Sequence, residues 1–209
     1  MGRRAPVARL SDRVPPVASV GLGPVWFRSG EVILQDTLIR EATAADLAGI
    51  LAIYPRAFPD EDLVPVVRAL AALPADEVLS LVAERAGQVV GHVLFTRCRA
   101  GQGGPVVALL APLCVTPKLH RQGLGGRLVR AGLAHLAGEG IAYALVLGDP
   151  AYYSRFGFRQ EPSIATPYPL PAEWASGWQG LALRDSWQGL SPTCLVVPAP
   201  WQSPSLWQP

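Results

Sequence analysis

One segment, residues 113–129, limits what this chain can fold into more than any other. An apolar strand, Val106–Val115, leads into a turn, and a basic, glycine-rich stretch then opens an amphipathic helix. The first N–H groups of a helix have no partner inside it, and the aligned peptide dipoles place partial positive charge there. The side chains that would hold an anion away are missing at Gly123, Gly125 and Gly126. The segment therefore predicts a seat for a phosphate or a diphosphate.

Two common phosphate-binding motifs do not fit this segment. A Walker loop requires Gly-Lys followed by Ser or Thr, whereas the chain has Gly125-Gly126-Arg127. A dinucleotide fingerprint requires a third glycine where Leu128 stands. It also places its glycines directly after the strand, whereas residues 116–122 intervene here. Both motifs are excluded by these residues.

The segment instead resembles motif A of the GNAT superfamily of acetyl-CoA-dependent N-acetyltransferases. The family signature is Arg/Gln-x-x-Gly-x-Gly/Ala, and the chain reads His120-Arg121-Gln122-Gly123-Leu124-Gly125. His120 stands where the family has Arg or Gln. In the family this segment binds the coenzyme A diphosphate mainly through backbone amides, so the changed side chain leaves the binding site in place.

Two further features follow the family's order along the chain. Pro112 lies in the strand before the motif, and because proline cannot donate to a sheet ladder it indicates an edge, a bulge or a place where strands separate. In the family, the fourth strand bulges and parts from the fifth, which frees backbone groups for the pantetheine arm. Residues 142–147 read as a second buried strand. Tyr153 then precedes the Gly157-Phe158 pair by four residues, which is the spacing of a tyrosine common in the family.

The resemblance covers residues 36–197 and implies the fold. We expect an α/β protein with the GNAT fold, in which a mixed central β-sheet is flanked by helices and its fourth and fifth strands are splayed. Residues 1–35 are predicted to be a poorly ordered, basic, Pro- and Gly-rich leader, and residues 198–209 a Pro- and Trp-rich tail. A secretory signal is disfavoured because Pro15, Pro16 and Pro24 break the apolar centre of the leader.

Periodicity and turn residues predict the remaining elements. Thr43 and Asp46 form a capping-box pattern ahead of a helix that runs from Leu47 to a break at Pro55. Ala86-Gly87 indicates a hairpin turn. Strands are predicted over residues 37–41, 78–85, 88–99, 181–184 and 193–197, and helices over residues 60–73 and 121–138.

The resemblance also implies roles for the site residues. Leu113, Cys114 and Val115 would hold the pantetheine, and the N–H of Val115 or a neighbour would polarise the acetyl carbonyl. The diphosphate would be held by Arg121, Gln122, Gly123, Leu124, Gly125 and Gly126. Tyr153 is the candidate general acid, because an ordinary tyrosine pKa of about 10 suits proton donation to a departing thiolate. Acetyl-CoA is the implied co-substrate, and no metal is implied.

Several residues have a second interpretation. Tyr153 could pack in the core with its hydroxyl satisfied, and the adjacent Tyr152 is expected to be structural. Cys114 could be a nucleophile in a covalent mechanism, but a small buried residue in an apolar strand is the favoured interpretation.

The general base and the acceptor site stay open. The conceivable bases are Glu84, His92 and Asp149, of which Asp149 would also suit a helix N-cap. Three aromatic residues either line an acceptor pocket or belong to the core: Tyr168, Trp174 and Trp178.

Composition argues against several other classes. A net charge of +2 is too small to indicate a nucleic-acid surface. Apolar runs are interrupted well before the ~18 residues that a membrane helix needs. Cys98, Cys114 and Cys194 form no Cys-x-x-Cys pair, which argues against a disulfide scaffold or a zinc cluster and favours the reducing cytoplasm.

The predicted function is an N-acetyltransferase that passes the acetyl group of acetyl-CoA directly to a primary amine of a small molecule or a protein. The acceptor is left open, and so is a homodimer. The first alternative is a non-catalytic acyl-CoA-binding module on the same fold, because the enzyme and the module need the same cofactor-binding residues. The second is an interaction protein that uses the leader and the tail, for which loss of residues 1–35 would abolish function and leave coenzyme A affinity intact.

Overall fold

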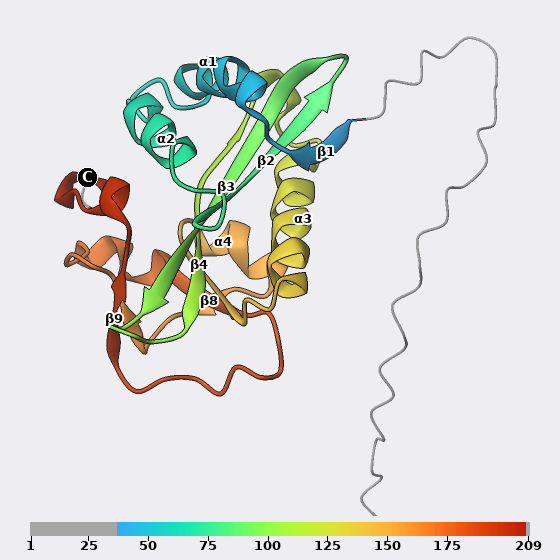
Figure 1. Cartoon of the computed structure of the whole chain (residues 1–209). Helices are drawn as coiled ribbons and strands as arrows, with labels where there is room; N and C mark the ends of the chain where they lie inside the picture. The colour runs from blue at the N-terminus through green and yellow to red at the C-terminus, as the bar shows by residue number, and fades with distance from the viewer. Residues whose placement is uncertain (1–36, 208–209) are drawn as a thin grey trace, which may run out of the picture. The chain divides into compact units, whose positions relative to one another are not determined.

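The computed structural model describes residues 37–207, so the predicted leader lies outside the described residues. A mixed sheet with helices on both faces forms this part of the chain (Figure 1). The strands are β1 (Leu38–Glu41), β2 (Val78–Arg85), β3 (Gln88–Ala100), β4 (Val106–Val115), β5 (Tyr143–Leu147), β6 (Arg159–Gln160), β7 (Ile164–Ala165), β8 (Trp178–Ala182) and β9 (Thr193–Val196). The α-helices are α1 (Leu47–Ala57), α2 (Val64–Ala71), α3 (Leu124–Gly138) and α4 (Pro150–Tyr153).

The sheet separates between β4 and β5. Its order is β1-β2-β3-β4-β5-β8-β6, with β9 paired to the end of β3. Within this order all neighbours are antiparallel except β4 and β5, which run parallel over residues 108–110 of β4. Beyond Leu110, β4 continues to Val115 paired with β3 alone. The predicted GNAT fold with splayed fourth and fifth strands is therefore confirmed, and Pro112 lies where the strands part.

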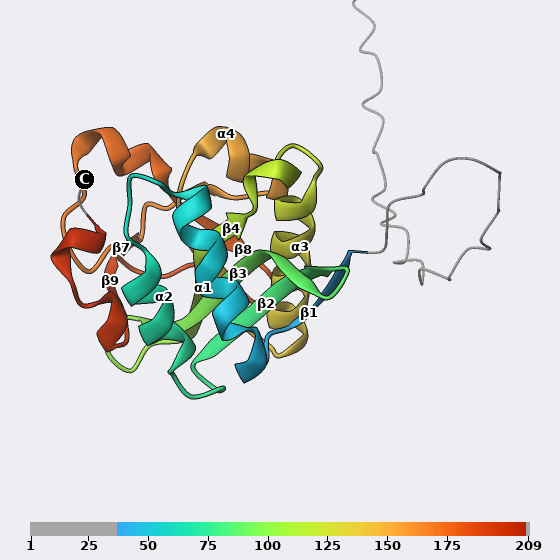
Figure 2. The same cartoon turned by 90° about the horizontal axis from the view of Figure 1, so that it is seen from above.

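Each face of the sheet has its own core, and Figure 2 shows from above the helices that cover the sheet. Tyr54 of α1 and Leu70 of α2 pack with Leu94 on one face. Leu128 of α3 packs with Phe95 on the other. Leu94 and Phe95 are neighbours in β3, and successive side chains of a strand point to opposite faces. All five side chains are at most 1% exposed, so the alternation along β3 is what joins two separate apolar layers.

The elements differ from the predictions mainly at their ends. Helix α1 continues through Pro55 and stops at Ala57, because a proline near the end of a helix removes only one of the last hydrogen bonds. Helix α2 spans only Val64–Ala71 of the predicted residues 60–73, with Pro65 in its first turn. Helix α3 begins at Leu124, later than predicted, because Gly123 adopts a left-handed φ of 77°.

The segment after Val197 packs into the α1–α2 core. Trp201 and Trp207 are 7% and 2% exposed. The Trp201 indole N–H donates to the Thr96 hydroxyl at 3.0 Å, and the Trp207 indole N–H donates to the Trp201 carbonyl at 3.0 Å. The residues that we predicted as a tail therefore continue the folded unit as far as residue 207, the last residue that the structure describes.

Candidate functional site

The turn before α3, residues 121–126, forms what we call the glycine cradle. Arg121 and Gly123 both have positive φ, 61° and 77°. This conformation is costly for a residue with a Cβ and is concentrated at functional sites, so its presence at Arg121 is informative. The Gly123 carbonyl accepts the Arg127 N–H at 3.1 Å and starts α3. Turns of this kind gather backbone N–H groups into a concave anion site.

A cavity of about 690 Å³, the cradle cavity, opens above these glycines. The predicted cofactor residues in its lining are Leu113, Val115, Arg121, Gly123, Leu124, Gly125 and Gly126. The separated end of β4 and the start of α3 therefore meet in one space. Gln122 lies outside this lining, and its side-chain amide donates to the Lys118 carbonyl at 3.3 Å instead.

Basic side chains surround the cradle cavity. Arg121, Arg130 and Arg155 are in its lining, which contains no acidic side chain among the described residues. The Arg155 guanidinium lies 4.0 Å from the centre of the Tyr152 ring, and that of Arg130 lies 5.5 Å from the Phe156 ring. The Arg155 Nε–H also donates to the Tyr152 carbonyl at 2.8 Å. Stacking holds each cation in place, and the terminal N–H groups of the guanidinium can still bind an anion. Our sequence interpretation missed Arg155, although it stands two residues after Tyr153.

Tyr152, which we expect to be structural, lines the cradle cavity. A Cβ added to Gly125 would lie 2.7 Å from the Tyr152 hydroxyl oxygen. Glycine at this position therefore lets the phenol lie against the backbone of the cradle. Tyr152 and Tyr153 are adjacent on the single turn of α4, and their rings meet edge to face at 4.9 Å.

Tyr153 lies in a second cavity of about 320 Å³, the Tyr153 cavity. Phe58 and Leu113 line both cavities, so the two adjoin where β4 leaves β5. Burial raises the pKa of Tyr153 above its ordinary value, and its neighbour Tyr152 adds to the effect. The Tyr153 hydroxyl makes no hydrogen bond to any other residue of the described chain. A protonated, unpaired phenol next to the open strand is suited to give a hydrogen bond or a proton to a bound group.

Cys114 belongs to the opposite face of β4. It is 1% exposed, packs in the core on the α1–α2 side, and lies outside the lining of both cavities. Burial raises the pKa of its thiol to about 12, so it is a thiol and not a thiolate near neutral pH. This geometry favours the buried structural interpretation over the nucleophilic one.

Each candidate general base has another partner. Glu84 accepts from the Arg40 guanidinium at 2.7 Å. Asp149 caps α4 by accepting the Ala151 N–H at 2.8 Å, as the sequence predicted. His92 is buried, with Tyr54 on Nδ1 at 2.7 Å and Ser80 on Nε2 at 2.9 Å. None of the three lines the cradle cavity or the Tyr153 cavity.

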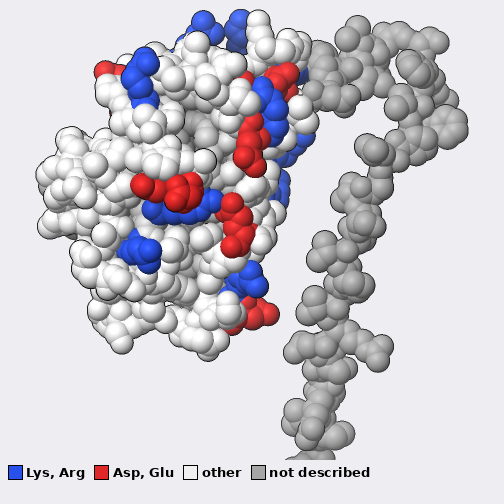
Figure 3. All heavy atoms as spheres, viewed as in Figure 1, with Lys and Arg blue, Asp and Glu red and all other residues white. Residues whose placement is uncertain are grey.

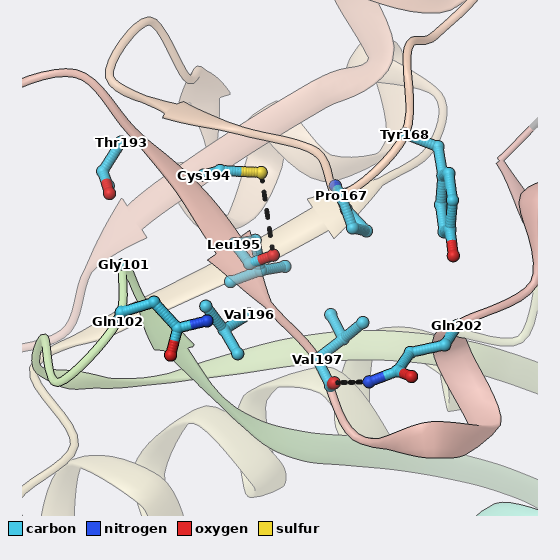
Figure 4. Close-up of a pocket in the computed structure, with 10 residues that line it drawn as sticks. All are labelled: Gly101, Gln102, Pro167, Tyr168, Thr193, Cys194, Leu195, Val196, Val197 and Gln202. Atoms are coloured by element: carbon cyan, nitrogen blue, oxygen red, sulfur yellow. Dashed lines mark hydrogen bonds between the residues drawn. The ribbon is translucent and has the colours of Figure 1, made fainter.

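The three aromatic residues considered for an acceptor pocket do not gather at this site. Trp178 is in the core, where its indole N–H donates to the Ile164 carbonyl. Trp174 is half-buried and lines neither cavity. Tyr168 lines a third cavity beside Cys194, which Figure 4 shows. That cavity adjoins Gly101, just past the end of β3, whereas the cradle cavity lies at the opposite end of the β3–β4 pair.

Comparison with known proteins identifies the family. A family model described as the Acetyltransferase (GNAT) family matches residues 47–158. The chain belongs to the GNAT acetyltransferase family. The match includes β4, the glycine cradle and both tyrosines of α4, so the predicted resemblance is confirmed.

Curated relatives of this GNAT chain include two Escherichia coli K12 proteins. It is 38% identical over 146 residues to the uncharacterized N-acetyltransferase YjhQ, an alignment covering 64% of this chain and 77% of YjhQ. It is 37% identical over 139 residues to the uncharacterized N-acetyltransferase YhbS, covering 66% of this chain and 80% of YhbS. Family and relatives together make the chain an acyltransferase, as predicted.

Two solved GNAT structures are similar over most of the chain. The YhbS structure from Escherichia coli in complex with CoA has a TM-score of 0.70 and 32% identity, and covers 80% of this chain and 92% of that one. A GNAT acetyltransferase from Brucella melitensis in complex with acetyl-CoA has a TM-score of 0.64 and 31% identity. The match covers 80% of this chain and 99% of that one.

Residues 37–207 lack two further features. No helix in this part of the GNAT chain combines the length and the apolar character that crossing a bilayer requires. No group of three His, Cys, Asp or Glu side chains in the same part is arranged to bind a metal ion.

Proposed function

We propose that this GNAT enzyme binds acetyl-CoA in the cradle cavity and transfers the acetyl group directly to a primary amine. One observation carries the proposal: the end of β4 that has parted from β5, the glycine cradle and a phenol with no hydrogen bond to another described residue lie around two adjoining cavities. CoA and acetyl-CoA in the solved structures of relatives support the same ligand.

The lining of the cradle cavity fits that ligand. Backbone N–H groups of residues 121–126 and the guanidinium groups of Arg130 and Arg155 would hold the diphosphate. Backbone groups of residues 113–115, which have no partner on β5, would bind the amide groups of the pantetheine. Leu113, Cys114 and Val115 therefore act through their main chain, which explains how the Cys114 side chain can be buried on the other face.

Acetyl-CoA supplies the acetyl group as a thioester. The neutral amine nitrogen of the acceptor forms a bond to the carbonyl carbon while the carbon–sulfur bond breaks. The N–H of Val115 or a neighbour polarises the carbonyl oxygen. Tyr153 gives one proton to the departing sulfur. The attacking nitrogen releases one proton to solvent, and the Tyr153 phenolate takes one proton back from solvent, which restores the phenol. Because its pKa is raised, the Tyr153 hydroxyl is protonated when the sulfur departs.

Calorimetry and a thiol-release assay test this function together. We expect heat on mixing with acetyl-CoA, and release of free thiol when a suitable amine is added. Tyr153→Phe is expected to lower kcat by about a hundredfold, because the variant loses the general acid, and to keep acetyl-CoA affinity. Tyr168→Phe makes the same change in the third cavity and serves as the matched control.

Two results would contradict the proposal. Absence of acetyl-CoA binding would remove the cradle cavity as the cofactor site. Binding without acetyl transfer to any amine would favour the non-catalytic acyl-CoA-binding module.

The proposal also includes a cellular compartment and an oligomeric state. We place the enzyme in the cytoplasm, since Cys98 and Cys114 are free, buried thiols, which suits a reducing compartment. Self-association into a homodimer stays a prediction.

A further inference from the structure

The Tyr153 cavity has a composition that the family motifs do not specify. It is lined by β4 from Leu109 to Leu113, by the loop between α1 and α2, and by the segment after Val197. The side chains that matter here are Phe58, Glu61, Leu63, Trp201, Leu206 and Trp207. Three of these six are aromatic, and among residues 37–207 Glu61 is the one charged residue in the lining. The cavity is therefore an apolar space with a single carboxylate.

Hydrogen bonds hold the aromatic wall of this cavity in place. The Trp201 indole is held by the Thr96 hydroxyl, and the Trp207 indole by the Trp201 carbonyl, both at 3.0 Å. The two rings lie 6.1 Å apart at 62°. Because both indole N–H groups are already used, the rings offer apolar surface to a ligand and no hydrogen bond. A wall held in this way loses little side-chain freedom when a ligand binds.

The charge and the volume of the Tyr153 cavity further restrict which ligands fit it. Glu61 is exposed and lies in the α1–α2 loop, and no basic side chain of the described part of the chain lines this cavity. A cationic group is therefore the complementary one. A volume of about 320 Å³ is at the small end of ligand sites, and at about 30 Å³ for each water-sized group it holds on the order of ten non-hydrogen atoms.

We propose that the acceptor is a small primary amine that carries an aryl or branched alkyl group. This inference rests on the proposed function and names the substrate class of the same site. The apolar group packs against Trp201 and Trp207, and the ammonium approaches along Glu61 before losing its proton and facing Tyr153. Glu61 is a recognition residue for the cation. The surface over the C-terminal segment in Figure 3 shows no charged atoms, in keeping with an apolar approach.

Fluorescence titration of the acetyl-CoA-loaded enzyme tests the acceptor class directly, because Trp201 and Trp207 line the cavity. The probes are 2-phenylethylamine, isoamylamine, spermidine, an aminoglycoside and a lysine-containing peptide, and thiol release is followed in parallel. We expect the first two to bind and to react about a hundredfold better than the polar amines, since burying an aryl or branched alkyl group stabilises binding by ~2–3 kcal/mol.

Glu61→Gln tests recognition of the cation. It should raise KM for 2-phenylethylamine about five- to tenfold with kcat and acetyl-CoA affinity unchanged. Binding of the uncharged analogue 2-phenylethanol should not respond to this change. Asp60→Asn alters the same charge one residue away, outside the cavity lining, and should leave all of these values as they are.

The outcomes separate this inference from the proposed function. Turnover of spermidine, the aminoglycoside or the peptide in preference to the apolar amines would overturn the inference and leave the acetyltransferase in place. Tight binding of apolar amines without thiol release would support the cavity assignment and contradict the catalytic proposal. Equal effects of Glu61→Gln and Asp60→Asn would remove Glu61 from recognition.

Discussion

Tyr152 and Tyr153 are consecutive residues that serve different cavities. Successive positions on a helix point about 100° apart, so the single turn of α4 directs one phenol to the glycine cradle and the other to the Tyr153 cavity. The Asp149 N-cap fixes where that turn begins. Insertion or loss of one residue between Asp149 and Tyr153 would turn the two phenols away from the cavities that they line. Position on the turn therefore matters as much as residue type.

His92 gives a prediction of pH-dependent stability. Burial lowers its pKa to about 3, whereas the ordinary value in an unfolded chain is about 6.5. The unfolded state therefore binds more protons between these values, so the stability present above pH 6.5 is lost as the pH falls. We expect the wild-type protein to lose about 2 kcal/mol more than His92→Gln between pH 7 and pH 5, measured by urea denaturation.

A loss of stability between pH 7 and pH 5 that is as large in His92→Gln as in the wild-type protein would contradict this prediction. The buried neutral imidazole would then not govern the acid sensitivity.

At the scale of elements, α3 must approach Tyr152 closely. In Gly125→Ala the new Cβ would lie 2.7 Å from the Tyr152 hydroxyl, so the ring must move into the cradle cavity. We expect acetyl-CoA affinity to fall by about tenfold, which corresponds to the ~1–3 kcal/mol typical of an overpacked site, as calorimetry would show.

Gly138→Ala is the matched change at the other end of α3. A Cβ there meets no heavy atom within 4 Å, so acetyl-CoA affinity should stay the same and stability should rise by about 0.5–1 kcal/mol. Equal cofactor affinity in both variants would show that the contact between Tyr152 and Gly125 is unimportant for binding.

The elements also show what local sequence can predict. The β2–β3 hairpin was predictable because Ala86 and Gly87, both with positive φ, follow a strand pattern. The cradle was predictable because its glycines are contiguous with the strand before and the helix after. The Tyr153 cavity was not, because its wall depends on tertiary contacts such as that between Trp201 and Thr96, 105 residues apart. Glu61 acquires its place only from this packing, and no local pattern distinguishes it from other surface carboxylates.

At the scale of the whole described chain, the segment after Val197 completes the α1–α2 core. Trp207 is 2% exposed and contacts Trp178 and Trp201 edge to face. We expect Trp207→Ala to lower the free energy of unfolding by about 3–5 kcal/mol, because it leaves a cavity the size of an indole. Urea denaturation measures the change.

Trp174→Ala removes the same side chain from a half-buried position, and its cost should be less than half as large. Equal stability of Trp207→Ala and the wild-type protein would show that packing of the Trp207 side chain contributes nothing to folding.

The two core layers have a practical consequence for redesign. Trp201 and Trp207 belong to the layer beneath α1 and α2, whereas Leu124 and Leu128, which seat the cradle helix, belong to the layer on the far side of the sheet. Phe58 and Leu113 line both cavities, but Trp201 and Trp207 are separated from the cradle helix by the sheet, and well-separated changes usually add independently. We therefore expect substitutions at Trp201 and Trp207, in protein engineering or in evolution, to change which amine the enzyme prefers and to leave its binding of the nucleotide unchanged.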